Sequence, residues 1–131
     1  MNRSLAKVSV IVRDYDEAID YYVKTLDFVL IADEVVSEDK RWVVVSPSAA
    51  SAAQLLLAKA KNEQELEAIG NQTGGRVFLF LETDDFWRDY NRYKEAGVDF
   101  VETPRSEAYG DVVVFKDLYG NKWDLIGHRS A

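Results

Sequence analysis

The feature that most constrains the fold is an internal repeat. The two halves of the 131-residue chain align when one is shifted by 70 residues, or by 71 at the first helix. The matching segments are Asp14 with Asp84 or Asp85, Leu26-Asp27-Phe28 with Ala96-Gly97-Val98, and Gln54-Leu55-Leu56 with Asp124-Leu125-Ile126. A repeat of this kind predicts two copies of one structural unit.

Each half is predicted to contain a strand, a helix and three further strands. In the first half, alternating Val8, Val10 and Val12 indicate a strand. Asp14 is a good helix N-cap, and Glu17 follows at the spacing of a capping box. The predicted elements are strands over 7–12, 28–36, 41–46 and 53–58, a helix over about 15–25, and a short helix over 63–69 that Gly70 ends.

After a flexible loop over 71–75, the same order starts again. We expect a helix that begins at Asp84-Asp85 and ends at Gly97, where a left-handed cap is needed. The expected strands are 76–81, 98–102, 111–115 and 122–126, with a turn region over 105–110 and a tail over 128–131. Gly120-Asn121 is suited to the tight turn that closes the final hairpin.

One such unit would leave an open sheet that cannot cover its own apolar face, whereas two units could cover each other and leave a cleft. We therefore expect a single α+β domain over residues 1–131, with repeat units at about 5–60 and 75–128. The two βαβββ repeats would form a curved, mixed, eight-stranded arrangement around a cleft.

The charge balance argues against several classes of partner. The formal net charge is −7 and the pI about 4.7, which disfavours binding to nucleic acid and to anionic membranes. The sequence contains no Cys and no apolar run long enough to span a bilayer. These properties favour a cytoplasmic protein, and an acidic surface suits a cationic ligand.

Several segments resemble one known family. The run Val8 to Asp14, followed by Ala18, Tyr21-Tyr22 and Leu26-Asp27-Phe28, looks like the opening of the glyoxalase/bleomycin-resistance/dioxygenase (vicinal oxygen chelate) superfamily. Ala96-Gly97-Val98 and the run from Phe115 to Leu125 resemble its second half. The resemblance implies the fold predicted above. It also implies a dimer, sometimes with halves exchanged, and 71–75 is the segment that could permit the exchange.

The resemblance also allows a test of the metal site, because family enzymes bind a divalent ion through His, Glu or Gln on the first and last strands of each half. The matching positions here are Lys7, Gln54, Val77 or Phe78, and Asp124. A protonated amine and an apolar side chain offer no lone pair to a metal. The single His, His128, lies beyond the last predicted strand. We therefore expect no metal at the usual site and no other cofactor.

Lys7 and Asp124 leave several interpretations open. They could form an ion pair in place of the metal, or Lys7 could bind an anionic group of a ligand and Asp124 a cationic one. Lys7 could also serve in Schiff-base or proton-transfer chemistry if it is buried. Strand alternation places Ser9 on the same face as Lys7. On the third strand, the sequence does not decide whether Arg41 or Trp42 faces the cleft.

The aromatic side chains Phe78, Phe80, Tyr109, Phe115 and Trp123 have two interpretations. Most aromatic residues at strand spacing belong to a core. Alternatively, some would stack on a flat or cationic ligand. The candidate ligand-binding residues are Lys7, Ser9, Gln54, Phe78, Phe80, Tyr109, Phe115, Trp123 and Asp124.

Two functions follow as hypotheses. The first is a metal-independent protein, presumed from the resemblance to be a homodimer, that binds a cationic or aromatic small molecule as bleomycin-resistance proteins do. The alternative is a glyoxalase-like lyase or isomerase, or a dioxygenase-type enzyme, with an atypical or lost metal site.

Overall fold

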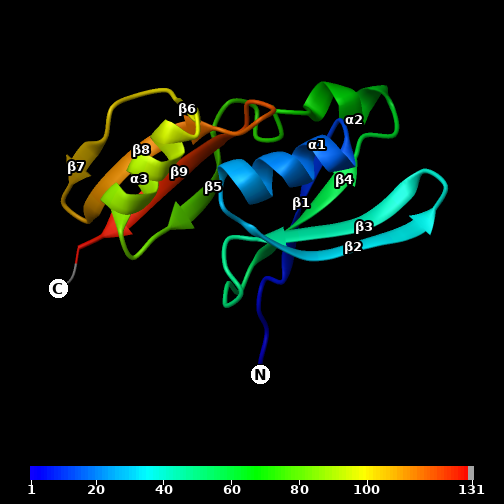
Figure 1. Ribbon diagram of the computed structural model, residues 1–131, viewed down its shortest axis with the longest axis horizontal. Helices are drawn as coiled ribbons and strands as arrows, with labels where there is room; N and C mark the ends of the chain where they lie inside the picture. Colours follow the sequence, from blue (N-terminus) through cyan, green and yellow to red (C-terminus); the bar gives the residue numbers. More distant parts are fainter. Residues whose placement is uncertain (130–131) are drawn as a thin grey trace. The chain divides into compact units, whose positions relative to one another are not determined.

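The computed structural model describes residues 1–129, which divide into two compact units at Ile69–Gly70. Unit 1 contains four strands and two α-helices in the predicted order, together with a π-helical turn (Figure 1). They are β1 (Lys7–Val12), α1 (Tyr15–Asp20), the π-helix η1 (Tyr21–Thr25), β2 (Val29–Ser37), β3 (Lys40–Ser46), β4 (Gln54–Lys59) and α2 (Glu63–Ala68). The predicted first helix is therefore α1 continued by η1.

Unit 2 repeats this plan with one strand in two pieces. Its elements are β5 (Val77–Glu82), α3 (Phe86–Glu95), β6 (Asp99–Phe100), β7 (Arg105–Glu107), β8 (Gly110–Lys116) and β9 (Lys122–His128). The expected turn region over 105–110 is shorter than predicted, because residues 105–107 form β7 and pair with β8, which leaves the turn at 108–109. The expected strand over 98–102 is only two residues long, and β9 extends to His128 instead of ending at Ile126.

The break between β6 and β7 has a local cause. Pro104 has no N–H to donate to β8, so the edge strand is interrupted beside it. The carboxylate of Glu102 accepts a hydrogen bond from the Val114 N–H at 3.1 Å. This contact satisfies a donor of β8 at the interruption, and pairing resumes at Arg105.

The two sheets have the same strand topology. Sheet A has the order β1-β4-β3-β2, and sheet B has β5-β9-β8-β6 with β7 also on β8. In each sheet the first and last strands of the unit are parallel neighbours and the other pairs are antiparallel. This confirms an α+β fold with two mixed sheets.

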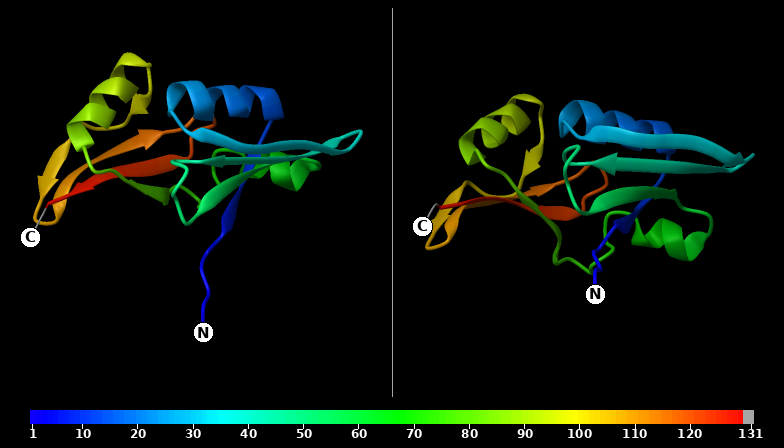
Figure 2. Two further views of the ribbon diagram at one scale, coloured as in Figure 1. Left: turned by 60° about the horizontal axis from the view of Figure 1, so that its bottom comes forward. Right: turned by 90° about the horizontal axis from the view of Figure 1, so that it is seen from below.

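A helix covers one face of each sheet. Figure 2 shows α1 over sheet A and α3 over sheet B, and α1 contacts β3 and β4 while α3 contacts β9. The side chains between α1 and sheet A are buried, among them Val10, Tyr22, Val43 and Leu57. We call the opposite side of each sheet its far face. Among residues 1–129, no helix has the length and hydropathy needed to cross a membrane.

Gly97 tests how much a helix end contributes to stability. Its φ is +84°, and a Cβ added there would meet no atom within 4 Å. Gly97→Ala should therefore lose only the cost of a left-handed backbone, about 1 kcal/mol in the free energy of unfolding. Gly97→Asn should lose less, since Asn tolerates this conformation. Urea denaturation measures both, and equal stability of all three proteins would refute the argument.

Candidate functional site

The far face of sheet A brings together three of the predicted residues. In the ladder between β1 and β4, Lys7 lies opposite Gln54 and Ser9 opposite Leu56. Lys7 and Ser9 are exposed and Gln54 is half-buried. Strand alternation places all three on the far face, whereas the buried Val10 and Leu55 lie on the face toward the helix. This face therefore carries an ammonium, a hydroxyl and an amide side by side.

The register of β3 with β4 shows which residues of β3 face the helix. Val43 and Val45 lie opposite Leu57 and Leu55, so they face the helix, and Arg41 shares their side. Trp42 therefore lies on the far face, and its side chain is 39% exposed. Sequence reasoning did not select Trp42, and only the cross-strand register identifies its face.

The far face of sheet B carries Phe80 and Asp124. They lie opposite each other in the ladder between β5 and β9, and Val114 of β8 lies on the other side of Asp124. The Phe80 ring is 64% exposed, while Asp124 is half-buried. An exposed aromatic ring is thus the direct neighbour of a partly desolvated carboxylate.

Burial raises the pKa of Asp124 above its ordinary value, with a smaller contribution in the same direction from the charge of Glu102. The nearby Arg105 acts in the opposite direction. Arg105 Nε donates to both carboxylate oxygens of Glu102, at 3.2 and 3.0 Å, and Nη1 donates to Glu107 at 2.6 Å. Because Arg105 is held by these two carboxylates, it compensates the charge of Asp124 only in part.

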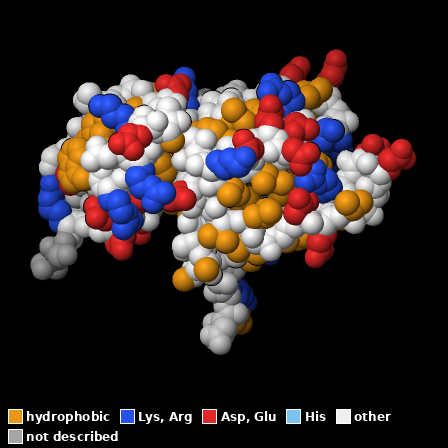
Figure 3. Space-filling model, viewed as in Figure 1, with side chains coloured by type: hydrophobic (Ala, Val, Ile, Leu, Met, Phe, Trp, Pro, Cys, Tyr) orange, Lys and Arg blue, Asp and Glu red, His pale blue; other side chains and the backbone are white. Residues whose placement is uncertain are grey.

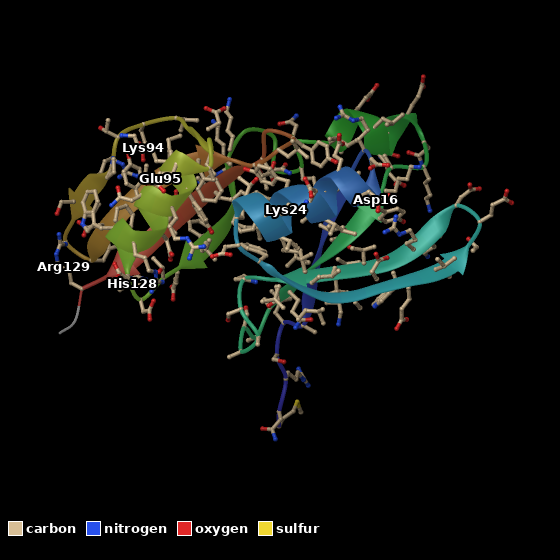
Figure 4. All side chains as sticks on the ribbon, viewed as in Figure 1. Asp16, Lys24, Lys94, Glu95, His128 and Arg129 are labelled. Atoms are coloured by element: carbon tan, nitrogen blue, oxygen red, sulfur yellow. The ribbon has the colours of Figure 1, made fainter. Side chains whose placement is uncertain are left out.

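The other predicted residues have different surroundings. Phe115 and Trp123 are 0% and 2% exposed and stack with their centroids 5.8 Å apart in the core of unit 2. Phe78 is half-buried. Tyr109 is 47% exposed, and its ring centroid lies 6.1 Å from that of His128. Figure 4 shows His128 near the end of β9, where its Nε2 lies 3.1 Å from Glu82.

The donor set expected for a divalent metal does not fit in this chain. Lys7 brings an ammonium beside Gln54, and Val77 and Phe78 bring no donor atom. Of the four positions expected for metal ligands, only Gln54 and Asp124 carry a side-chain oxygen that could bind a metal, and they belong to different units. Within the described range 1–129, no three His, Cys, Asp or Glu side chains are grouped so that they could hold an ion.

The surface charge is mixed despite the net charge of −7. On the side seen in Figure 3, acidic and basic side chains alternate over both units. Ion pairs account for part of this pattern, including Arg41 with Asp16 and Arg88 with Asp84. The acidic balance is therefore not one continuous field on that side, and the local neighbours of Asp124 matter more than the total.

Comparison with known proteins gives a family and several similar structures. Residues 4–125 match the model of the Glyoxalase/Bleomycin resistance protein/Dioxygenase superfamily. An uncharacterized protein of Shewanella frigidimarina is 56% identical over 127 residues, which cover 96% of this chain and 94% of that protein. The crystal structure of UcmS2 has a TM-score of 0.83 at 28% identity, covering 96% of this chain and 98% of its own.

A further solved structure has a described ligand class. TnmS3, an antibiotic binding protein from Streptomyces sp. CB03234, has a TM-score of 0.78 and 29% identity, and the match covers 98% of each chain.

Proposed function

This chain belongs to the Glyoxalase/Bleomycin resistance protein/Dioxygenase superfamily, and we propose that it binds a small molecule without a metal ion, as bleomycin-resistance proteins do. The ligand class that we propose is a flat aromatic cation. Similarity to the antibiotic binding protein TnmS3 supports small-molecule binding. The poor fit of Lys7 and Phe78 to a metal supports the absence of metal from the binding step.

The observation that carries this proposal is the juxtaposition of Phe80 and Asp124 across β5 and β9. An exposed ring offers a face on which an aromatic ligand can stack. The carboxylate beside it is disfavoured by burial and is stabilised when a cation approaches. A ligand that is both flat and positively charged satisfies the two groups together.

The polar groups on the far face of sheet A are a second candidate region, proposed within unit 1 alone. Lys7, Ser9 and Gln54 would offer hydrogen bonds to the oxygen-bearing groups of a small molecule, as the few polar groups of an apolar binding site commonly do. We also propose a homodimer in the cytoplasm, in line with the family resemblance. Light scattering coupled to size-exclusion chromatography tests the dimer, and a monomeric mass would contradict it.

Two substitutions test the ligand class. Phe80→Ala and Asp124→Asn should each weaken binding of a planar aromatic cation such as proflavine by about tenfold, since a stacking or charge interaction of 1–2 kcal/mol is lost. Trp87→Ala is the matched control, because Trp87 is an exposed aromatic (51%) on α3. Fluorescence titration measures all four dissociation constants. Equal affinities of wild type and both variants would reject Phe80 and Asp124 as binding residues.

The pH dependence follows from the raised pKa of Asp124. The side chain is neutral below its pKa in the folded protein, so affinity for a permanently charged aromatic cation should rise as pH increases through that value. Asp124→Asn should remove this rise. The same substitution should not destabilise the protein at neutral pH, because burial disfavours the charged form that it removes. A pH profile unchanged in Asp124→Asn would contradict this assignment.

A further inference from the structure

The two inner strands of sheet A separate toward one end. Strands β3 and β4 pair only through Val43–Val45 and Leu55–Leu57. Beyond these pairs, β3 stays with β2 and β4 stays with β1, so the sheet opens between them (Figure 1). The opening is a pocket of about 350 Å³ within unit 1, near the lower end of the range for small-molecule sites. We call it the strand split.

Tyr15 holds the strand split in place. Its side chain comes from the first turn of α1, is 7% exposed, and lines the pocket. The Tyr15 hydroxyl accepts a hydrogen bond from the backbone N–H of Arg41 at 3.3 Å, which satisfies a donor that β4 does not reach. The Arg41 guanidinium lies 5.2 Å from the centroid of the Tyr15 ring. The opening is therefore supported by specific contacts.

Arg41 forms a fixed wall of the strand split. Its guanidinium pairs with Asp33 at 2.8 Å and with Asp16 at 2.9 Å. Because the guanidinium is already paired with two carboxylates, it is not available as the main partner of a charged ligand.

Three lysines also line the strand split, namely Lys40, Lys59 and Lys61. None of their ammonium groups forms an ion pair with a described residue. Two carboxylates line the same pocket, Asp39 and Glu65, and both Glu65 oxygens accept hydrogen bonds, from Asn62 and from the Lys61 backbone N–H. The local excess of available positive charge contrasts with the net charge of −7.

The rest of the lining is apolar. Trp42, Leu56 and Ala58 lie at the pocket, and apolar surface makes up most of its wall. A flat apolar body could rest against these side chains while an anionic group reaches the lysines. We propose that the strand split is a binding site for a small aromatic carboxylate, separate from the site that contains Phe80 and Asp124.

A titration with 2-naphthoate tests this second site. We expect saturable binding to the wild-type protein by isothermal titration calorimetry, and at least tenfold weaker binding of the neutral isostere 2-naphthamide. The double variant Lys40→Gln/Lys59→Gln should bind 2-naphthoate about tenfold more weakly, or weaker still. Lys94→Gln, on the exposed surface of α3 (Figure 4), is the matched control and should bind as the wild type does.

Two further variants separate this site from the one above. Ala58→Leu fills the strand split and should abolish 2-naphthoate binding, with circular dichroism and a thermal melt confirming that it folds. Asp124→Asn should leave 2-naphthoate affinity unchanged, so failure of one proposal does not decide the other. Absence of binding up to millimolar 2-naphthoate, equal affinity for 2-naphthamide, or unchanged affinity in Ala58→Leu would each overturn the proposal.

Discussion

Asp117→Ala should destabilise the protein by about 3–5 kcal/mol, because one buried carboxylate serves five donors. Asp117 is 5% exposed. Its Oδ1 accepts the backbone N–H groups of Tyr119, Gly120 and Asn121 at 3.0–3.1 Å. Its Oδ2 accepts from Asn121 Nδ2 at 3.1 Å and from Trp123 Nε1 at 3.2 Å.

Removal of this carboxylate leaves buried donors without an acceptor, and each costs about 1–3 kcal/mol unless water reaches it. The expected loss is a large part of the total stability of a small domain, about 5–15 kcal/mol. The same turn joins β8 to β9 and sets the register that places Asp124 beside Val114. Asp117→Ala should therefore also weaken ligand binding at Asp124.

Urea denaturation of three proteins checks this prediction. The free energy of unfolding of Asp117→Asn should lie between those of wild type and Asp117→Ala. The amide keeps one acceptor oxygen, but its NH₂ group is a donor that faces other donors. Asp84→Ala is the control at an exposed position (88% for the side chain) and should change stability by less than about 0.5 kcal/mol. A loss below 1 kcal/mol in Asp117→Ala would show that the five contacts contribute little.

Gly70→Ala should be almost as damaging, for a steric reason. A Cβ at Gly70 would lie 1.9 Å from the backbone carbonyl oxygen of Tyr119, and backbone atoms cannot move aside as a flexible side chain can. The φ of +75° adds the cost of a left-handed conformation. We expect a loss of about 3 kcal/mol or more, since the turn at Asp117 must shift to make room.

Gly74→Ala is a closely matched control for this substitution. Gly74 has a similar φ of +67°, but an added Cβ would meet nothing within 4 Å. The free energy of unfolding of Gly74→Ala should fall by only about 1 kcal/mol, which is the cost of the left-handed backbone conformation alone. The difference between the two variants in thermal melts then measures the close packing of Gly70 against Tyr119. Equal losses in Gly70→Ala and Gly74→Ala would contradict it.

Much of the fold could be predicted from the sequence because local signals and the repeat agree. Asp14 and Asp85 both act as N-caps and accept from the backbone N–H three residues later. Gly97 and its repeat counterpart Asp27 both have positive φ. The strands β1, β3 and β4 lie within one residue of their expected bounds at either end. These features depend on neighbours in the chain, which the sequence specifies directly.

Features that depend on strand pairing were harder to predict. The face occupied by Trp42 follows from the register of β3 with β4, which no short motif encodes. Strand β7 was missed because Pro104 and short polar residues are typical of a turn. Phe80 and Asp124 were both selected from sequence, but their direct opposition required the irregular register of β5 against β9.

The strand split could not be predicted from the sequence. It arises where β3 and β4 stop pairing and where Tyr15 reaches the Arg41 N–H from a helix 26 residues earlier. Lys40, at the start of β3, lies there together with Lys59 and Lys61, which are about 20 residues later in the chain. Only the tertiary structure brings such residues together.

The most direct test of the proposed function is calorimetric titration of EDTA-treated protein with bleomycin and with proflavine, repeated after addition of Ni²⁺, Mn²⁺, Zn²⁺ or Fe²⁺. Our account predicts that the metal-free protein binds bleomycin or proflavine saturably. The affinity for that ligand should be unchanged by added metal and weaker in Asp124→Asn. Absence of binding by the metal-free protein, with binding or turnover restored by one of the metals, would contradict it and identify a metal-dependent protein.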